Sequence, residues 1–515
     1  MLWQIFTAVS LAKLLFIPAY RSTDFEVHRN WLAITHSLPL KRWYIDETSP
    51  WTLDYPPLFA WFEYLLSIAA QFFDPEMLKV ANLNYASDNT VLFQRISVIM
   101  TDVVFALGVK KCLYYVNDGR GAFRGTAKWF STPTILAFLL LCNVGLFVVD
   151  HIHFQYNGFL MGVLLLSVGS ILQRENIQAA FWFAVLLNLK HIYLYIAPVY
   201  FVYLLRSYCI ETHQSGSSSF HLKRLVALGL VVITVFVLTY LPFLGQLPQV
   251  ASRLFPFKRG LCHAYWAPNA WAWYNVLDKA LTLVAGKLSL LDPTAVPVAS
   301  MTGGLVQEFE YVVLPTIGPK VTFLCTLLAL SPALLLLLRR PNEPRVFIRA
   351  VILCAFASFL FGWHVHEKAV LIMIIPMTLL AAASADDCRL FLLLSITGHV
   401  SLFPLLITPF ENVIKSVLVF AFSLASYSFL SALHYDPKSK STLVKFRLWE
   451  QVYLCGLVIV ALYECCLHRI VDPAGKLPFL PLLLMSVYCA AGVVYVWVLF
   501  IAESFKSFGK KTKRN

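Results

Sequence analysis

An acidic segment follows the first apolar stretch of the chain, with the sequence Ser-Thr-Asp-Phe-Glu-Val-His-Arg-Asn-Trp at residues 22–31. Thr23 followed three residues later by Glu26 is a capping-box pattern, so we expect a helix to start at Asp24 with Glu26 as its reciprocal cap. The helix dipole would keep Asp24 ionised. An ionised carboxylate at a membrane boundary can accept a proton from an attacking hydroxyl group, which is worth about 10²–10⁴-fold in rate. A solvated helix start is the alternative interpretation of Asp24, and Glu26 is also a candidate substrate contact.

A second polar cluster, Asp-His-Ile-His-Phe-Gln-Tyr-Asn, occupies residues 150–157 at the end of an apolar segment. So many polar groups at membrane depth are unfavourable unless they pair or bind something. The His-x-His spacing could ligate a metal, but no second ligand set stands nearby in the sequence. Binding of substrate hydroxyl groups, or hydrogen bonding between helices, is the favoured interpretation. The candidate substrate contacts are Asp150, His151, His153, Gln155 and Asn157.

A third cluster, Trp-His-Val-His-Glu-Lys at residues 363–368, breaks an apolar stretch that runs from Val351 to Ala383. The zinc-protease pattern needs two histidines four apart around a glutamate, whereas both histidines here precede the glutamate. A hairpin with His and Lys at its tip suits a phosphate group at the level of the lipid headgroups. His366 and Lys368 are therefore candidate phosphate contacts, and His364 is a candidate substrate contact. A plain charged turn between two helices is the alternative.

Cations and aromatic residues also gather at residues 255–271. Arg259 is a candidate phosphate contact, and Tyr265, Trp266 and Asn269 are candidate substrate contacts. The same composition equally describes an aromatic belt at a membrane interface, and the sequence does not separate the two interpretations.

The composition indicates that lipid covers the protein. Of its 515 residues, 59% are hydrophobic and only 13% are charged, and the mean hydropathy is +0.70. This leaves too little polar surface for a soluble protein of this size. The 11 cysteines are an odd number and lie mostly in apolar runs, so they imply no disulfide framework.

Apolar segments long enough to cross a bilayer predict about fourteen helical spans, with the N-terminus in the cytosol. The net charge is +13, and the distribution of the basic residues agrees with this topology. Of the 41 Lys and Arg residues, 23 fall in the predicted cytosolic intervals. This is the positive-inside pattern and argues against a nucleic-acid surface. The first span lacks a basic start and a cleavage site, so we expect it to be retained. The predicted spans are 3–20, 94–113, 130–149, 157–173, 178–189, 191–205, 225–242, 319–338, 346–363, 367–384, 388–407, 412–433, 448–467 and 479–502.

This topology places two long stretches on the lumenal side. Residues 21–93 form a first lumenal loop, in which the aromatic content predicts interfacial helices, and residues 243–318 form a second. Residues 503–515 form a basic cytosolic tail. We expect residues 1–515 to be a single integral membrane domain.

Taken together, these segments resemble one family, the dolichyl-phosphate-glucose-dependent α-1,3-glucosyltransferases of the endoplasmic reticulum. The resemblance runs through most of the chain and rests on segments 22–31, 53–57, 150–157, 257–261 and 364–368, in the family's order. The stretch 261–269, Leu-Cys-His-Ala-Tyr-Trp-Ala-Pro-Asn, is similar to that of members that add the second glucose. The Lys-Thr-Lys-Arg-Asn end is similar to a retrieval signal of that compartment, although a basic tail can also bind anionic lipid.

The resemblance implies an all-α polytopic membrane protein with the C-type glycosyltransferase fold. It implies a dolichyl-phosphate-glucose donor, a monoglucosylated dolichyl-diphosphate-linked acceptor, Asp24 as general base and His366 near the donor phosphate. A lipid phosphate is already a good leaving group, so inverting transfer needs one base and cationic stabilisation of the departing phosphate. We therefore expect no metal and no other cofactor.

Three alternatives remain open at this stage. The same fold could add the first glucose, or could use dolichyl-phosphate-mannose as donor. A transporter whose intramembrane histidines and acids relay protons also fits the composition. Against a transporter, the polar clusters fall at the lumenal ends of the predicted spans, and no inverted repeat is evident.

Overall fold

The computed structural model describes residues 1–117, 131–212, 217–255, 260–262, 266–291, 311–436, 438, 440–442 and 444–506. The chain divides into two compact units, which we describe separately. The first unit comprises residues 1–256 and 337–347, and the second comprises residues 257–336 and 348–515.

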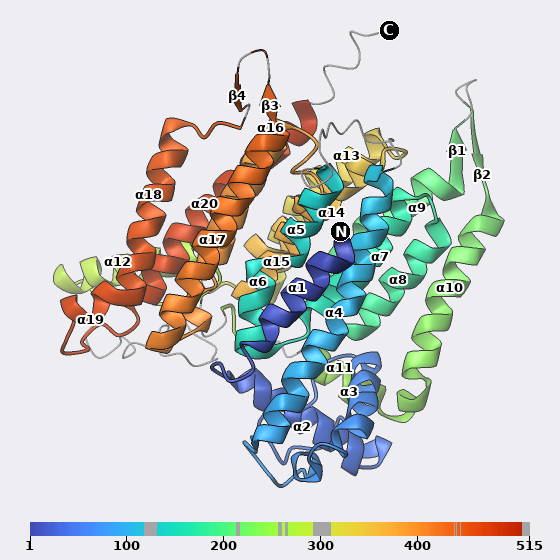
Figure 1. Ribbon diagram of the computed structural model, residues 1–515, viewed down its shortest axis with the longest axis horizontal. Helices are drawn as coiled ribbons and strands as arrows, with labels where there is room; N and C mark the ends of the chain where they lie inside the picture. The colour runs from blue at the N-terminus through green and yellow to red at the C-terminus, as the bar shows by residue number, and fades with distance from the viewer. Residues whose placement is uncertain are drawn as a thin grey trace. The chain divides into compact units, whose positions relative to one another are not determined.

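The first unit is built from helices, with one short β-hairpin among its described residues. In Figure 1, α2, α3 and α11 gather at one end of the bundle that α4, α7 and α8 form, and the β1–β2 hairpin lies at the other end. Its elements are α1 (Leu2–Leu14), α2 (Thr23–Ser37), η1 (Leu40–Arg42), α3 (Pro57–Ala70), η2 (Pro75–Leu78), α4 (Asp88–Asn117), α5 (Thr132–Leu141), α6 (Val144–Leu146), η3 (Phe147–Phe154), α7 (Asn157–Leu172), α8 (Asn176–Leu189), η4 (His191–Ile196), α9 (Ala197–Leu204), η5 (Leu205–Cys209), β1 (Ile210–Thr212), β2 (Ser218–Phe220), α10 (Leu222–Tyr240), η6 (Leu241–Gln246) and α11 (Leu247–Leu254).

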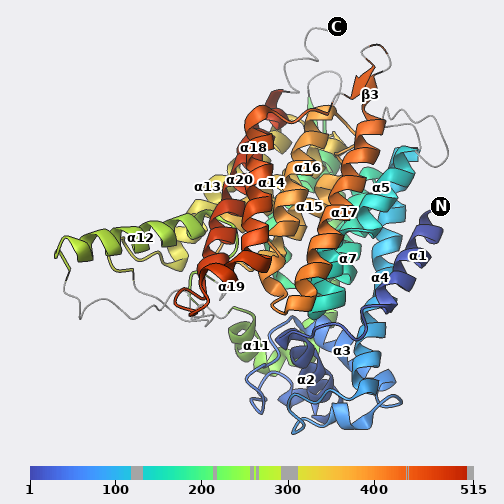
Figure 2. The same cartoon turned by 60° about the vertical axis from the view of Figure 1, so that its left-hand side comes forward.

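The second unit is also helical. Figure 2 shows α16, α17, α18 and α20 side by side, with α12 running off at a steep angle to them. Its elements are α12 (Ala270–Lys287), α13 (Pro319–Arg339), α14 (Pro344–Phe361), η10 (Glu367–Val370), α15 (Leu371–Thr378), α16 (Ala385–Val400), η11 (Phe403–Leu405), α17 (Pro409–Leu433), β3 (Tyr435–Asp436), β4 (Ser441–Thr442), α18 (Leu448–Leu462), η12 (Tyr463–Leu467), α19 (His468–Val471) and α20 (Leu480–Lys506). The end of α13 and the start of α14 belong to the first unit.

Close packing of α4 against α7 sets the centre of the first unit. A Cβ atom on Gly162 would lie 2.5 Å from the backbone nitrogen of Phe105, and one on Gly108 would lie 2.5 Å from the carbonyl oxygen of Gly162. Only glycine lets two helix backbones approach so closely, as is common between membrane helices. This contact fixes the register of α4 against α7, and both helices carry residues of the candidate site at one end.

Ten helical segments of the described chain are long and apolar enough to cross a membrane. They coincide with ten of the fourteen predicted spans, which confirms the prediction of a mainly helical, multi-span membrane protein. The predictions at 3–20, 157–173 and 178–189 correspond to the shorter apolar helices α1, α7 and α8. The predicted span at 367–384 is divided into η10 and the eight-residue α15, with Pro376 inside α15, and it stays a prediction. The number fourteen stays a prediction.

The first long loop folds onto the first unit through buried polar contacts. Nδ1 of His28 in α2 lies 2.6 Å from Oε1 of Glu63 in α3, and burial raises the pKa of the Glu63 carboxyl although His28 opposes this shift. The pKa of the Asp74 carboxyl is shifted in the opposite direction. Burial raises its pKa, but hydrogen bonds from Ser87 and Tyr85 outweigh burial, and the net pKa is lowered. The His28–Glu63 contact joins α2, which carries Asp24, to α3.

Candidate functional site

The helix that carries Asp24 begins one residue earlier than the capping pattern predicted. Ser22, rather than Thr23, is the N-cap of α2, and its hydroxyl accepts a hydrogen bond from the backbone N–H of Asp24 at 3.2 Å. The prediction of a reciprocal Thr23–Glu26 capping box is therefore wrong, because Glu26 lies one position beyond the box. Both Glu26 oxygens instead accept hydrogen bonds from Arg29, at 2.7 and 2.8 Å. Asp24 still lies in the first turn, where the helix dipole favours its charge.

The second polar cluster meets Asp24 in the first unit. Its first residues form the π-helical segment η3, an uncommon geometry that occurs often at functional sites. Nε2 of His153 lies 3.1 Å from Oδ2 of Asp24, and the Gln155 amide donates to the same oxygen at 2.7 Å. The Asp24 side chain remains 23% exposed. The same carboxylate oxygen thus contacts His153 and Gln155, while part of the side chain stays accessible to another molecule.

A hydrogen-bonded chain continues from Gln155 into the interior. The Asn157 side chain donates to the side-chain oxygen Oε1 of Gln155 at 2.8 Å and to Oδ1 of Asp150 at 2.9 Å, and the backbone N–H of Gly158 donates to Oδ2 of Asp150. A Cβ atom on Gly158 would lie 2.3 Å from Oδ1 of Asp102, so only glycine fits there. Asp150 is fully buried and its hydrogen bonds support the segment from within the protein.

The other histidine of the cluster, His151, contacts a different carboxylate. Nε2 of His151 lies 2.9 Å from Oδ2 of Asp102 in α4, and Nζ of Lys13 in α1 lies 2.6 Å from the same oxygen. All three side chains are at most 8% exposed. The histidines at 151 and 153 therefore contact separate acids, and the substrate contacts predicted for Asp150 and His151 stay predictions.

In the second unit the structure brings together two segments that the sequence separates by about a hundred residues. The backbone N–H of His364 donates to the carbonyl oxygen of Leu261 at 2.9 Å, and Cys262 and Val365 form a parallel β-bridge. Nδ1 of His364 lies 3.1 Å from the carbonyl oxygen of Gly260. His364 has a positive φ of 53°, so the chain turns sharply there. The predicted phosphate-binding hairpin is thus held against the second long loop.

The residues at the hairpin tip differ in exposure. His366 caps η10, and its Nδ1 accepts from the backbone N–H of Lys368 at 3.4 Å and lies 3.0 Å from Oε2 of Glu367. The His366 side chain is 29% exposed, whereas Lys368 is buried. Of the predicted phosphate contacts, His366 is thus the more accessible. Arg259 and Tyr265 lie outside the described residues.

Two other predicted contacts have structural partners. Asn269 is the N-cap of α12, where its side chain accepts from the backbone N–H of Trp271 at 3.1 Å and donates to the carbonyl oxygen of Phe359 at 3.2 Å. Trp266 is buried, and Nζ of Lys279 lies 5.5 Å from the centre of its ring. Their contact with a substrate stays a prediction.

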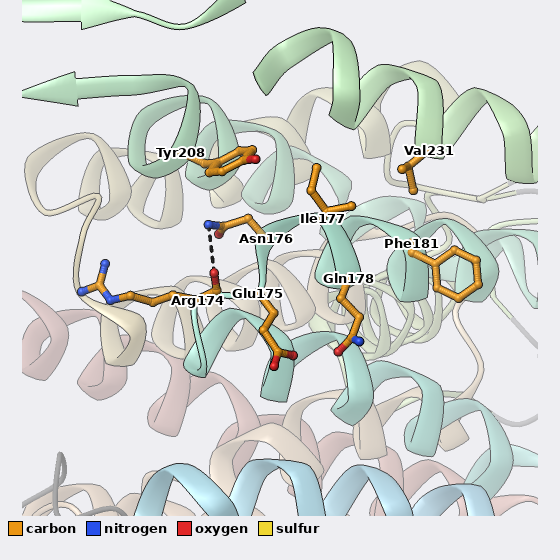
Figure 3. A pocket seen from close by; sticks show the side chains of 8 residues that line it. All are labelled: Arg174, Glu175, Asn176, Ile177, Gln178, Phe181, Tyr208 and Val231. Carbon is orange, nitrogen blue, oxygen red and sulfur yellow. Dashed lines mark hydrogen bonds between the residues drawn. The ribbon is translucent and has the colours of Figure 1, made fainter. Parts of the chain in front are cut away.

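A pocket of about 590 Å³ lies in the first unit but at the opposite ends of α7 and α8 from Asp24. Figure 3 shows that apolar and polar side chains both line it, namely Arg174, Glu175, Asn176, Ile177, Gln178, Phe181, Tyr208 and Val231. Because α7 starts beside Gln155 and ends at Leu172, the length of the helix separates this pocket from the Asp24 carboxylate. The pocket is therefore not part of the candidate catalytic site.

The sequence analysis did not name the charged residues within the apolar helices whose side chains contact the segments around the candidate site. Arg95 and Asp102 lie in α4, and Lys13 lies in α1. A signal for them was present, since ionisable residues in membrane helices are rare and usually have a partner or a function. Averaging hydropathy over a whole span hides such single charges.

The sequence comparisons agree with this architecture. The model of the ALG6, ALG8 glycosyltransferase family matches residues 9–500. This chain belongs to that family. A mouse protein is 54% identical, covering 98% of this chain and 96% of its own length, and an Arabidopsis thaliana protein is 46% identical, covering 97% and 96%. Both are named dolichyl pyrophosphate Glc1Man9GlcNAc2 alpha-1,3-glucosyltransferase, and a Drosophila melanogaster protein at 50% identity is named as a probable one.

Membership of the ALG6, ALG8 family confirms the predicted enzyme class and the predicted fold class. The chain is a multi-pass membrane glucosyltransferase with a mainly helical structure. The alternative of a proton-coupled transporter is thereby removed. These comparisons do not decide the roles of individual residues.

Proposed function

We propose that this enzyme transfers glucose from dolichyl-phosphate-glucose, in α-1,3 linkage, to a dolichyl-diphosphate-linked oligosaccharide that already carries one glucose. The acceptor is the one that the relatives' names give, and it agrees with our prediction of the second-glucose step. We propose that it acts in the endoplasmic reticulum membrane, with the active site facing the lumen.

The observation that carries the proposal is the partly exposed Asp24 carboxylate with its two partners on one oxygen. His153 and Gln155 both contact Oδ2 and orient the carboxylate, which we propose accepts the proton. In the proposed reaction the acceptor hydroxyl gives its proton to Asp24 while its oxygen attacks the anomeric carbon of glucose. The bond from that carbon to the phosphate oxygen breaks, and dolichyl phosphate leaves. Attack from the opposite face converts the β-linked donor into an α-linked product.

We propose that His366 contacts the departing donor phosphate. It lies at the tip of a sharp hairpin in the second unit, with a side chain more exposed than that of its neighbour Glu367. A hydrogen-bond donor from the protein at this position would stabilise the negative charge that develops on the phosphate oxygens. Lys368 and Arg259 are further proposed contacts with the same phosphate.

The acceptor is tested with purified full-length enzyme and defined lipid-linked oligosaccharides that bear either no glucose or one. We expect transfer to the monoglucosylated acceptor and little transfer to the unglucosylated one. Parallel reactions with dolichyl-phosphate-mannose test the donor, and we expect no transfer of mannose. Preference for the unglucosylated acceptor would assign the chain to the first-glucose step instead.

The phosphate contact is tested with His366→Ala. We expect kcat/KM for dolichyl-phosphate-glucose to fall while the KM for the acceptor stays unchanged, because the donor phosphate loses a contact that stabilises its developing charge. His434→Ala is a matched control, since His434 lies in the same unit and its ring contacts the carbonyl oxygen of Ala381. Unchanged donor kinetics in His366→Ala would remove this residue from the site.

A further inference from the structure

Arg95, near the start of α4, hydrogen-bonds to the two segments that meet at Asp24. The arginine is only 2% exposed. Its guanidinium donates to the carbonyl oxygens of His151 and Ile152, at 2.8 and 3.0 Å. It also donates to the carbonyl oxygens of Tyr20 and Ala19, at 2.8 and 3.4 Å. One planar side chain thus connects the segment before α2 to the end of η3. A single ammonium group, as in lysine, cannot reproduce this arrangement of hydrogen bonds.

The end of η3 needs such support. The last carbonyls of a helical segment have no partner within it, and leaving them buried and unpaired is unfavourable. Phe154, which is fully buried, has a φ of 92°, a conformation that a bulky side chain adopts only when its surroundings impose it. Arg95 holds the carbonyls of residues 151 and 152, and the Ser22 hydroxyl holds that of His153. Three successive carbonyls before the strained residue are therefore fixed.

We propose that Arg95 is a positioning residue for Asp24, acting with Ser22. Together they fix the turn at Phe154 so that the side chains of His153 and Gln155, which lie on either side of it, both reach Oδ2 of Asp24. Ser22 also accepts from the backbone N–H of Asp24, so the same hydroxyl group orders both partners. The proposal rests on the proposed role of Asp24 as the base. A small displacement of a catalytic group lowers turnover strongly, about 10²-fold for 1 Å.

The test measures kcat and both KM values for Arg95→Lys in the purified full-length enzyme, per folded molecule. We expect kcat to fall about tenfold or more with both KM values unchanged, because orientation of the base is lost while substrate binding is kept. Arg389→Lys is the matched control, a buried arginine of the second unit that pairs with Glu450. We expect its kcat to stay within about twofold of the parent enzyme. An unchanged kcat in Arg95→Lys, or a higher KM at the parent kcat, would overturn the proposal.

A double-mutant cycle separates positioning from an independent role. A residue that acts through Asp24 has nothing left to position once the carboxylate is gone, so Arg95→Lys should cause no further loss in an Asp24→Asn background. A radiolabelled donor and long incubation measure the residual turnover. Equal losses in both backgrounds would show that Arg95 acts independently of Asp24.

Ser22 provides a second route in case Arg95→Lys yields no folded protein. We expect Ser22→Ala to lower kcat with unchanged KM values, and Ser22→Thr to restore most of the lost turnover because the hydroxyl returns. Full turnover in Ser22→Ala would overturn the proposal. Near-normal turnover of Asp24→Asn would instead refute the base itself, so the two failures are distinguishable.

Discussion

Two Asp–His pairs, built on the same His-x-His sequence, differ sharply in their surroundings. His151 contacts Asp102, which also contacts Lys13, and all three side chains are nearly inaccessible. His153 contacts Asp24, whose side chain is 23% exposed. In the buried pair the negative charge is neutralised by a neighbouring cation, as membrane depth requires. Of the two carboxylates, only Asp24 is within reach of another molecule. We therefore expect the buried pair to contribute to stability and the Asp24 pair to contribute to catalysis.

The strongest test of this division removes the accessible charge. We expect Asp24→Asn to lower kcat by about 10²-fold or more, because the amide cannot accept the proton of the attacking hydroxyl. The amide has nearly the same size, so the protein should purify in normal yield. Glu47→Gln is the matched control, an exposed acid of the same loop that pairs with Arg253. Near-normal glucosyl transfer by Asp24→Asn would defeat the assignment of the base.

Removal of the buried charge should instead affect stability. Asp102→Asn leaves Lys13 without its buried counter-charge, and breaking such a pair from one side costs about 3–5 kcal/mol. We expect a clearly lower midpoint of thermal unfolding in detergent, with near-parental turnover in the molecules that fold. Lys13→Met combined with Asp102→Asn should recover most of the stability, since no uncompensated charge remains. Full stability with lost turnover in Asp102→Asn would reverse the roles of the two pairs.

The two histidines give a smaller and more direct comparison. His153→Ala removes one hydrogen bond to the Asp24 carboxylate, a bond worth about 1.5–3 kcal/mol when one partner is charged, so kcat should fall about tenfold or more. His151→Ala should lower the unfolding temperature with turnover per folded molecule within about threefold of the parent enzyme. Turnover and unfolding are measured on the same preparations. Equal effects of both substitutions on turnover would show that the pairs do not act separately.

The sequence was sufficient to name three candidate residues that the structure brings into contact. Asp24, His153 and Gln155 were all named as candidates, because polar groups at membrane depth need a partner or a ligand. Ten spans were also predictable, since an apolar run of about 20 residues has few alternatives to a membrane helix. These predictions depend on local composition, which a sequence displays directly.

Contacts between distant segments were not predictable in the same way. The bond between Ser22 and the carbonyl of His153 crosses 131 residues, and the true N-cap depends on that bond as well as on local pattern. The division of the His-x-His pair between two acids depends on the π-helical turn of η3 and on Phe154 at a positive φ. No sequence rule we applied indicates a π-helix, and bulky residues rarely adopt this backbone conformation.

Removal of metal ions with a chelator should leave turnover unchanged, the smallest of the expected effects. A metal held by the His-x-His sequence would need both imidazoles on one ion, yet Nε2 of His151 and Nε2 of His153 each contact a different carboxylate. Across the described ranges, no three His, Cys, Asp or Glu side chains converge as a metal site would require. We therefore expect prolonged treatment with EDTA to leave kcat unchanged, with His151→Ala treated in parallel. If EDTA abolished turnover and added zinc or manganese restored it, the two histidines would belong to one metal site. The separation of the two Asp–His pairs would then be wrong.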